Sequence, residues 1–281
     1  MKFYSLTILT LCSTTSVFGQ LFSTENRKDS VFESAVRKAK ISRHLVYKYT
    51  LNGNQPVDSS LVSETLYDKL GNAFEKIFYK EGKLEMRFNY TYADNLLNKV
   101  YEKNLKIPYT LVHEIEYDSL GNPFKEYAHT PKSSKGVAYA YIYNTNSQLT
   151  AIYRSFNKKG YYLFAEYIYE NGKILQSQTY STGVKDQFSI LYEYDESNKT
   201  KTLYNVIGTG RTKVIVYSYD ETGRLKKMSY AAGEVILTRD SKTQKDYFID
   251  EAYFYNPDNT LSQINIIKEG KLVELLRHYY F

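Results

Sequence analysis

Hydrophobic and polar side chains alternate with a period of two over short stretches that fill most of the chain. Between residues 84 and 92, large apolar or aromatic residues occupy every second position, and Glu, Arg, Asn and Thr stand between them. Residues 138–143 and 188–194 keep the same period, with tyrosine at many of the alternate positions. This pattern predicts β-strands of which one face is buried, a setting that tyrosine and β-branched residues favour.

A turn motif recurs between these strands. The sequence Tyr-Asp-Lys-Leu-Gly-Asn at Tyr67–Asn72 returns as Tyr-Asp-Ser-Leu-Gly-Asn at Tyr117–Asn122 and more loosely at Tyr219–Arg224. Turn openings from Tyr67 to Ile267 fall at near-multiples of one interval, so that sixteen units of about 12.5 residues cover this region. Each unit therefore predicts one strand and one turn.

A second kind of turn, Tyr-Lys-Glu-Gly-Lys-Leu at Tyr79–Leu84, returns at Tyr169–Ile174 and Ile267–Leu272. In the first kind, we expect the Asp side chain to accept hydrogen bonds from backbone amides ahead of it, which is favoured over a calcium site. In both kinds, Gly supplies a positive φ. The predicted structural turn residues are Asp68, Gly71, Gly82, Asp118, Gly121, Gly172, Asp195, Asp220, Gly223 and Gly270.

The predicted fold is all-β, with about eighteen antiparallel strands in sequential order. An open sheet of more than about ten strands does not stay flat. We therefore expect a long curled or spiralling repeat sheet, which spirals, folds into two layers or encloses something.

The region before the repeats has a different pattern. Residues Met1–Gly19 have the charged start, short apolar stretch and cleavage site of a secretory signal peptide, and its removal would take away Cys12, the single cysteine. Ser30 to Ala39 have the capping and spacing of a short helix that covers one end of the sheet. Strands are predicted near Leu45 to Thr50 and Leu61 to Tyr67. Residues 20–66 would then cap the repeat region, 67–281, within a single domain.

The Tyr-Asp-x-x-Gly turns resemble the YD repeats of Rhs-type bacterial proteins, over about Tyr67 to Phe281. That resemblance implies a long curling β-sheet, which in the family sometimes forms a shell around a toxin. The Tyr-x-x-Gly-Lys turns are similar to MORN-like repeats of some secreted and antitoxin-type proteins. Both motifs specify turns, so both indicate a fold rather than an activity.

Composition, charge and the length of apolar runs exclude some classes of function. Hydrophobic residues make up 42% and charged residues 24% of the 281 residues, which is typical of a soluble globular chain. The net charge of +6 is spread among alternating signs, so no nucleic-acid surface is predicted. No apolar run is long enough for a transmembrane helix.

Candidate chemistry is sparse. The four histidines, His44, His113, His129 and His278, lack metal-ligand spacing, and no catalytic motif is present. We therefore expect no metal, no cofactor, no catalytic residue and no enzymatic activity.

The 31 tyrosines are the remaining candidates, either as cross-strand packing or as an exposed ladder for sugars or proteins. The predicted binding surface consists of Tyr141, Tyr143, Tyr167, Tyr169, Tyr192, Tyr194, Tyr217 and Tyr219. The sequence thus predicts a secreted, non-enzymatic binding or scaffold module, periplasmic or outside the cell, with a surface glycan or an envelope protein as partner. Two alternatives stay open: an outer-membrane β-barrel, whose outward face would be apolar, and an antitoxin or immunity partner.

Overall fold

The computed structural model describes residues 36–133, 136–156, 160–180, 188–195, 199–206, 211–231, 235–236 and 248–281. Most of them lie in β-strands, so the all-β prediction is confirmed. The strands are β1 (Arg43–Asn52), β2 (Gln55–Tyr67), β3 (Ala73–Lys80), β4 (Lys83–Ala93), β5 (Leu96–Asn104), β6 (Leu111–Tyr117), β7 (Pro123–His129), β8 (Gly136–Tyr143), β9 (Leu149–Phe156), β10 (Tyr162–Glu170), β11 (Lys173–Thr179), β12 (Phe188–Tyr194), β13 (Lys199–Val206), β14 (Arg211–Tyr219), β15 (Leu225–Ala231), β16 (Val235–Ile236), β17 (Phe248–Tyr255), β18 (Leu261–Lys268) and β19 (Lys271–Tyr280).

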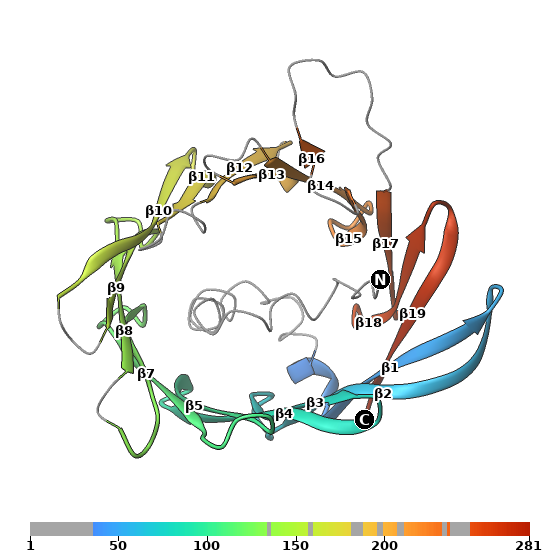
Figure 1. The fold of residues 1–281 in the computed structure, drawn as a ribbon, viewed down its shortest axis with the longest axis horizontal. Helices are drawn as coiled ribbons and strands as arrows, with labels where there is room; N and C mark the ends of the chain where they lie inside the picture. Colours follow the sequence, from blue (N-terminus) through green and yellow to red (C-terminus); the bar gives the residue numbers. More distant parts are fainter. Residues whose placement is uncertain are drawn as a thin grey trace.

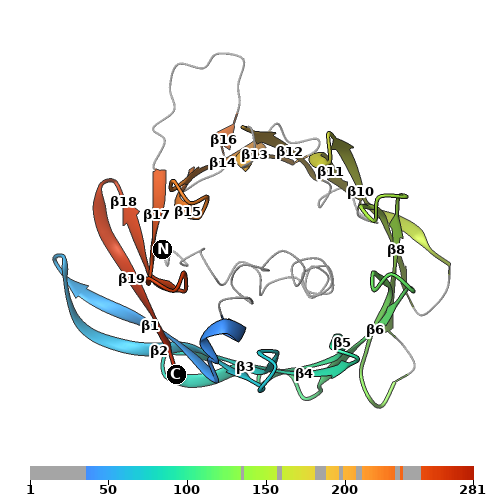
Figure 2. The ribbon, with the colours of Figure 1, turned by 180° about the vertical axis from the view of Figure 1, so that it is seen from behind.

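The strands form one closed antiparallel barrel (Figures 1 and 2). The sheet has 19 strands, and the two-residue β16 pairs only with the end of β14, so the ring itself contains the other 18. The ring closes where β1 pairs with β19, from His44 opposite Tyr280 to Tyr49 opposite Leu275. The expected strand number is confirmed, but the expected open, spiralling sheet is wrong.

A repeated β-bulge gives a physical reason for closure. At one end of the barrel, eight hairpins follow a tyrosine and each shifts register by one residue at that tyrosine, as between Glu116 and Tyr117 or between Ile142 and Tyr143. A bulge bends its strand and increases the local right-handed twist. Because the bulge recurs at the same height around the sheet, the bending adds up until β19 meets β1, which removes both free edges.

The turns after these tyrosines have a common geometry. In the turn between β6 and β7, the carboxylate of Asp118 accepts hydrogen bonds from the amides of Leu120 and Asn122, at 2.9 and 2.7 Å. Gly121 has a φ of 74°. This positive φ is open to glycine without steric cost. Asp68 and Asp220 accept corresponding amide bonds in their own turns.

The two faces of the wall differ sharply in burial. One face carries most of the fully buried side chains, among them Phe88, Val100, Ile152 and Leu276. In a closed barrel the inner face is concave, so side chains on it converge and cover one another, whereas the outer face is convex. The buried face is therefore the inner face. The short helix at residues 36–39 lies inside the outline of the ring, and its Val36 is only 1% exposed.

The outer face is exposed and carries ion pairs. Lys99 of β5 lies directly opposite Glu114 of β6, with 2.7 Å between Nζ and Oε1. Further outer-face pairs join β1 to β2, β3 to β4 and β15 to β17. They are Arg43–Glu64 at 2.7 Å, Arg87–Glu75 at 3.5 Å and Lys227–Asp250 at 2.9 Å. Apolar side chains also lie on this face, mainly on β8 to β14, such as Ile142 and Ile168.

The N-terminal predictions are tested only in part. The predicted signal peptide, Met1–Gly19, and the first part of the predicted helix lie outside the described residues, whereas residues 36–39 are helical. The two strands predicted after the helix exist as β1 and β2, and they belong to the same closed sheet as the repeats. No helix among the described residues is long and apolar enough to cross a membrane.

We predict that Asp118→Ala destabilises the barrel by about 1–2 kcal/mol, because two amides of the turn lose their acceptor. Urea unfolding of the full chain measures this. Ser119→Ala changes an exposed side chain of the same turn and serves as the control. Equal stability of the two variants would contradict the proposed role of the carboxylate.

Candidate functional site

All eight tyrosines of the predicted binding surface point to the inner face, as the strand registers show. They form two rows on neighbouring hairpins. The first row occupies the last or next-to-last position of β8, β10, β12 and β14, and the second lies two residues further from the turn. The first row is Tyr143, Tyr169, Tyr194 and Tyr219, and the second row is Tyr141, Tyr167, Tyr192 and Tyr217.

The first row belongs to a longer series of tyrosines at one end of the barrel. Because successive turns alternate between the two ends of the barrel, every second turn lies at the same end, which we call the tyrosine rim. The strands that lead into this rim, and β19 at the chain's end, have a tyrosine as their last or next-to-last residue: Tyr67, Tyr92, Tyr117, Tyr143, Tyr169, Tyr194, Tyr219, Tyr255 and Tyr280. The spacing is 25 or 26 residues except at the longer connection before β17.

Six of these rim tyrosines donate a hydrogen bond to the preceding hairpin. The hydroxyl of Tyr143 donates to the carbonyl of Pro123 at 2.8 Å, and that of Tyr169 donates to the carbonyl of Leu149 at 2.9 Å. The same contact joins Tyr92 to Ala73, Tyr117 to Leu97, Tyr255 to Leu225 and Tyr280 to Leu261, at 2.7–2.9 Å. These tyrosines of the rim therefore have a structural role, because their hydroxyls join adjacent hairpins through hydrogen bonds.

The second row has more varied partners. Tyr141 donates to Glu126 Oε2 at 2.7 Å, and the hydroxyls of Tyr192 and Ser177 are 3.2 Å apart. Burial raises the pKa of Tyr167, Tyr192 and Tyr217 above the ordinary value of tyrosine. These rings therefore remain neutral at physiological pH. Most are half-buried, so that they offer part of an aromatic face to the interior.

A buried acid–base cluster lies on the same inner face. His113 is 2% exposed and Glu126 is 1% exposed, and His113 Nδ1 is 3.0 Å from Glu126 Oε1. On its other side, His113 Nε2 is 3.6 Å from Glu102 Oε2. Burial lowers the pKa of His113, but its contacts with Glu102 and Glu126 outweigh burial and raise the pKa to about 9. At neutral pH the cluster therefore holds an imidazolium between carboxylates.

Two further polar groups face inward on other strands. Glu251 accepts hydrogen bonds from the hydroxyls of Tyr230 and Tyr253, at 3.0 and 2.6 Å. At the closure, His44 Nε2 lies 3.0 Å from His278 Nδ1, so two of the four histidines do meet. Among the described residues, no group of three or more His, Cys, Asp or Glu has an arrangement that could hold a metal ion.

Arg154 of β9 is a cation surrounded by aromatic rings on the inner face. Its guanidinium carbon lies 4.3 Å from the ring centre of Phe156, 5.4 Å from that of Phe164 and 5.7 Å from that of Tyr139. Such cation–π contacts partly compensate for the removal of the charge from water. Burial raises the pKa of Tyr139 to about 12, although the charge of Arg154 opposes this shift.

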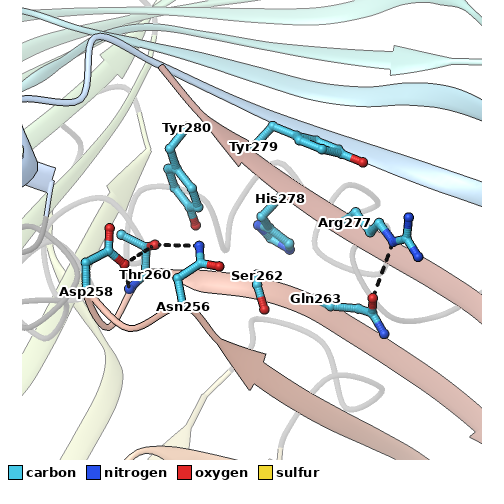
Figure 3. A pocket seen from close by; sticks show the side chains of 9 residues that line it. All are labelled: Asn256, Asp258, Thr260, Ser262, Gln263, Arg277, His278, Tyr279 and Tyr280. Carbon is cyan, nitrogen blue, oxygen red and sulfur yellow. Dashed lines mark hydrogen bonds between the residues drawn. The ribbon is translucent and has the colours of Figure 1, made fainter.

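A shallow pocket of about 550 Å³ lies where the β17–β18 turn meets β19 (Figure 3). Its polar side chains bind one another: Thr260 Oγ1 donates to Asp258 at 2.6 Å, and Arg277 donates to Gln263 at 3.3 Å. The lining consists of Asn256, Asp258, Thr260, Ser262, Gln263, Arg277, His278, Tyr279 and Tyr280. The predicted tyrosines are absent from this pocket.

The sequence analysis missed the inward-facing charges. Glu102, His113, Glu126, Arg154 and Glu251 were not among the predicted site residues. Each occupies the inward-facing phase of its strand, in which apolar or aromatic residues predominate, as Glu102 does with the buried Val100. A charged residue in the apolar phase is the signal that could have found them, since burying a charge is costly unless it is paired.

Comparisons with known proteins identify no family: no family model and no curated protein sequence match the chain. Among solved structures, a porin-like protein from Bacteroides uniformis matches with a TM-score of 0.41 and 10% identity, over 86% of this chain and 96% of that one. The TcdB2-TccC3-Cdc42 structure matches with a TM-score of 0.31 and 12% identity, over 79% of this chain and 13% of that one. A Photorhabdus luminescens Tc holotoxin pore matches with a TM-score of 0.33 and 10% identity, over 83% of this chain and 18% of that one.

This chain therefore spans less than a fifth of the length of the two toxin chains. Likenesses at this level do not bear on function. The YD-repeat relationship accordingly remains a resemblance of turns and strands, and the function has to be argued from the two faces of the barrel.

We predict that Tyr169→Phe lowers stability by about 0.5–1.5 kcal/mol, because it removes one hydroxyl-to-carbonyl clasp and keeps the ring. Thermal or urea unfolding measures the change. Tyr153→Phe is the control, because Tyr153 lies on the outer face and is 36% exposed. If Tyr169→Phe is as stable as Tyr153→Phe, the hydrogen bond from Tyr169 does not stabilise the barrel.

We also predict that the destabilisation caused by His113→Gln depends on pH. The pKa of His113 is raised from 6.5 to about 9 by folding, so its ionic stabilisation is complete below about pH 6.5 and is lost as the pH rises through 9. The variant should therefore lose roughly 2 kcal/mol near pH 6 and less near pH 10. Urea unfolding at both pH values tests this, and a pH-independent difference would contradict it.

Proposed function

We propose that this protein is a non-enzymatic binding barrel of the cell envelope, which holds a guest on its tyrosine-lined inner face. The observation that carries the proposal is the polarity of the two faces. The inner face presents half-buried aromatic rings with polar tips, which suit sugars and protein segments. The outer face presents ion pairs to its surroundings.

The width of the ring supports an interior guest. Eighteen strands at about 4.8 Å each give a perimeter of about 86 Å, or a width of about 28 Å between opposite backbones, before tilt is considered. Small barrels of about 8 strands are filled by their own side chains, whereas those of about 16 to 18 strands enclose more space than side chains fill. A barrel of this size with an aromatic inner face is suited to enclose another molecule.

An outer-membrane barrel is the second candidate, and closure favours it. A membrane-spanning sheet must have no free edge, and an even number of hairpin-connected antiparallel strands meets this requirement. Its outer face must also be apolar around the whole circumference. The ion pairs on β1 to β6 and β15 to β17 would then face lipid, at a cost of about 2–4 kcal/mol for each Lys or Arg near the midplane. We therefore propose an aqueous rather than a lipid surrounding.

The envelope location rests on the leader predicted for Met1–Gly19. The absence of a catalytic motif in the sequence supports a binding role rather than an enzymatic one. The inner carboxylates Glu126 and Glu251 also accept hydrogen bonds from neighbouring side chains, which suits structural support more than proton transfer to a substrate.

The first test of this function is fractionation of cells that produce the full chain. We expect the protein in the soluble envelope fraction without detergent. Recovery only from the outer membrane with detergent would overturn the aqueous barrel in favour of the membrane barrel.

The soluble protein is then immobilised and exposed to envelope extract, and bound sugar and protein are both analysed. Tyr167→Ala removes a half-buried inner ring and should reduce capture about fivefold, whereas the outer-face variant Tyr153→Ala should not. Equal capture by both variants would place the binding surface elsewhere.

A further inference from the structure

Arg154 is an inward-facing charge that has no acidic partner among the described residues. Its Nε atom is buried without a hydrogen-bond acceptor, and no ion pair joins it to a described carboxylate. Every other inner charge discussed above is bound by neighbouring side chains. Buried donors are nearly always satisfied, so an exception requires a physical reason.

The register explains why no carboxylate of the wall satisfies Arg154. Glu126, Tyr139, Arg154 and Tyr162 lie in one row across β7, β8, β9 and β10. Glu126 is therefore two strands away, at about 9.6 Å of backbone separation. One of its oxygens contacts His113 and the other accepts a hydrogen bond from Tyr141. Both carboxylate oxygens of Glu126 therefore already have partners, and the ring of Tyr139 lies between Glu126 and Arg154.

The surroundings of Arg154 are open enough to admit a ligand. Phe156, whose ring is nearest to the guanidinium, is 41% exposed, and Arg154 itself is half-buried. Phe156 and Tyr162 stack with 6.0 Å between their ring centres. The site therefore combines a planar cationic donor with accessible aromatic faces beside it.

We propose that Arg154 is the anchor of an anion site on the inner face, which takes the carboxylate of an acidic saccharide such as a uronic acid. Arginine binds a carboxylate through two parallel hydrogen bonds, one of which would give the buried Nε of Arg154 its acceptor. The sugar ring attached to that carboxylate would lie against Phe156 and Tyr162. This inference rests on the proposed function, because it names the guest of the inner face.

A saccharide is favoured over an acidic peptide by the closed sheet. Extended peptides commonly bind sheets by adding a strand to a free edge. The pairing of β1 with β19 leaves the ring without such an edge. A saccharide requires only aromatic faces and a few directed polar groups, which the inner face provides.

The test measures binding of oligogalacturonate, its neutral methyl ester and an oligoglutamate of matching charge to the full-length protein by calorimetry. We expect the wild type to bind the uronate and to bind the other two more weakly. Arg154→Gln should weaken uronate binding about ten- to hundredfold. Arg154→Lys should fall between the two, because lysine keeps the charge but loses the planar pair of donors.

The matched control is Lys103→Gln, which removes one positive charge from the exposed outer face. It should leave uronate binding unchanged, which excludes a general effect of net charge. Melting temperature provides a second readout: saturating uronate should raise it for the wild type and not for Arg154→Gln. Without ligand, the Gln variant should melt no lower than the wild type, because it removes a buried donor without an acceptor.

Three results would overturn the acid site. Uronate binding that is equal in wild type and Arg154→Gln shows that Arg154 is not the anchor. Oligoglutamate binding as tight as uronate binding shows a peptide guest instead. Binding of the methyl ester as tightly as the acid, unchanged by Arg154→Gln, shows that the inner face holds a neutral glycan, so the proposed function survives and the acid site does not.

Discussion

The contact on which the barrel depends is the hydrogen bond from a rim tyrosine to a backbone carbonyl of the hairpin before it. It requires the tyrosine to lie at or next to the end of its strand, to point inward and to lie two strands and two turns after the previous tyrosine. Six described examples, from Tyr92 to Tyr280, have nearly the same length. A slip of one residue would turn every tyrosine to the outer face. The tyrosines thus fix the register of each hairpin against its neighbour.

The same two-residue periodicity explains why the inner and outer faces of the barrel differ in burial and charge. Once the tyrosines point inward, every second residue of each strand is directed to the concave side, where side chains cover one another, and the residues between them meet the surroundings. The outer positions can then carry Lys99 and Glu114 at little cost. Inner charges are costly without close partners, and His113 has them in Glu102 and Glu126. The difference between the two faces is therefore a consequence of strand register rather than an independent feature.

The strands and turns could be predicted from sequence because their signals are local. Asp118 and Gly121 lie within one turn, and the alternation around Phe88 lies within one strand. Closure could not be predicted, because it depends on bending summed over eight bulges and on the meeting of His44 with Tyr280, which are more than 200 residues apart. The eight candidate tyrosines all lie on the inner face, and their role as a binding surface stays a prediction, whereas the inner charges were missed. Glu126 and His113 become partners only through the pairing of β6 with β7.

Arg154 departs from the apolar pattern of the inner face. Ile152, two residues earlier on the same face, is completely buried and obeys the apolar phase. An apolar residue at position 154 would pack equally well among Phe156, Phe164 and Tyr139, and it would leave no donor without an acceptor. Departures from an otherwise consistent pattern tend to mark functional positions rather than structural ones. Glu126, the acid of this row, is already bound by His113 and Tyr141, so the proposed carboxylate of a guest would supply the acceptor that Arg154 lacks among the described residues.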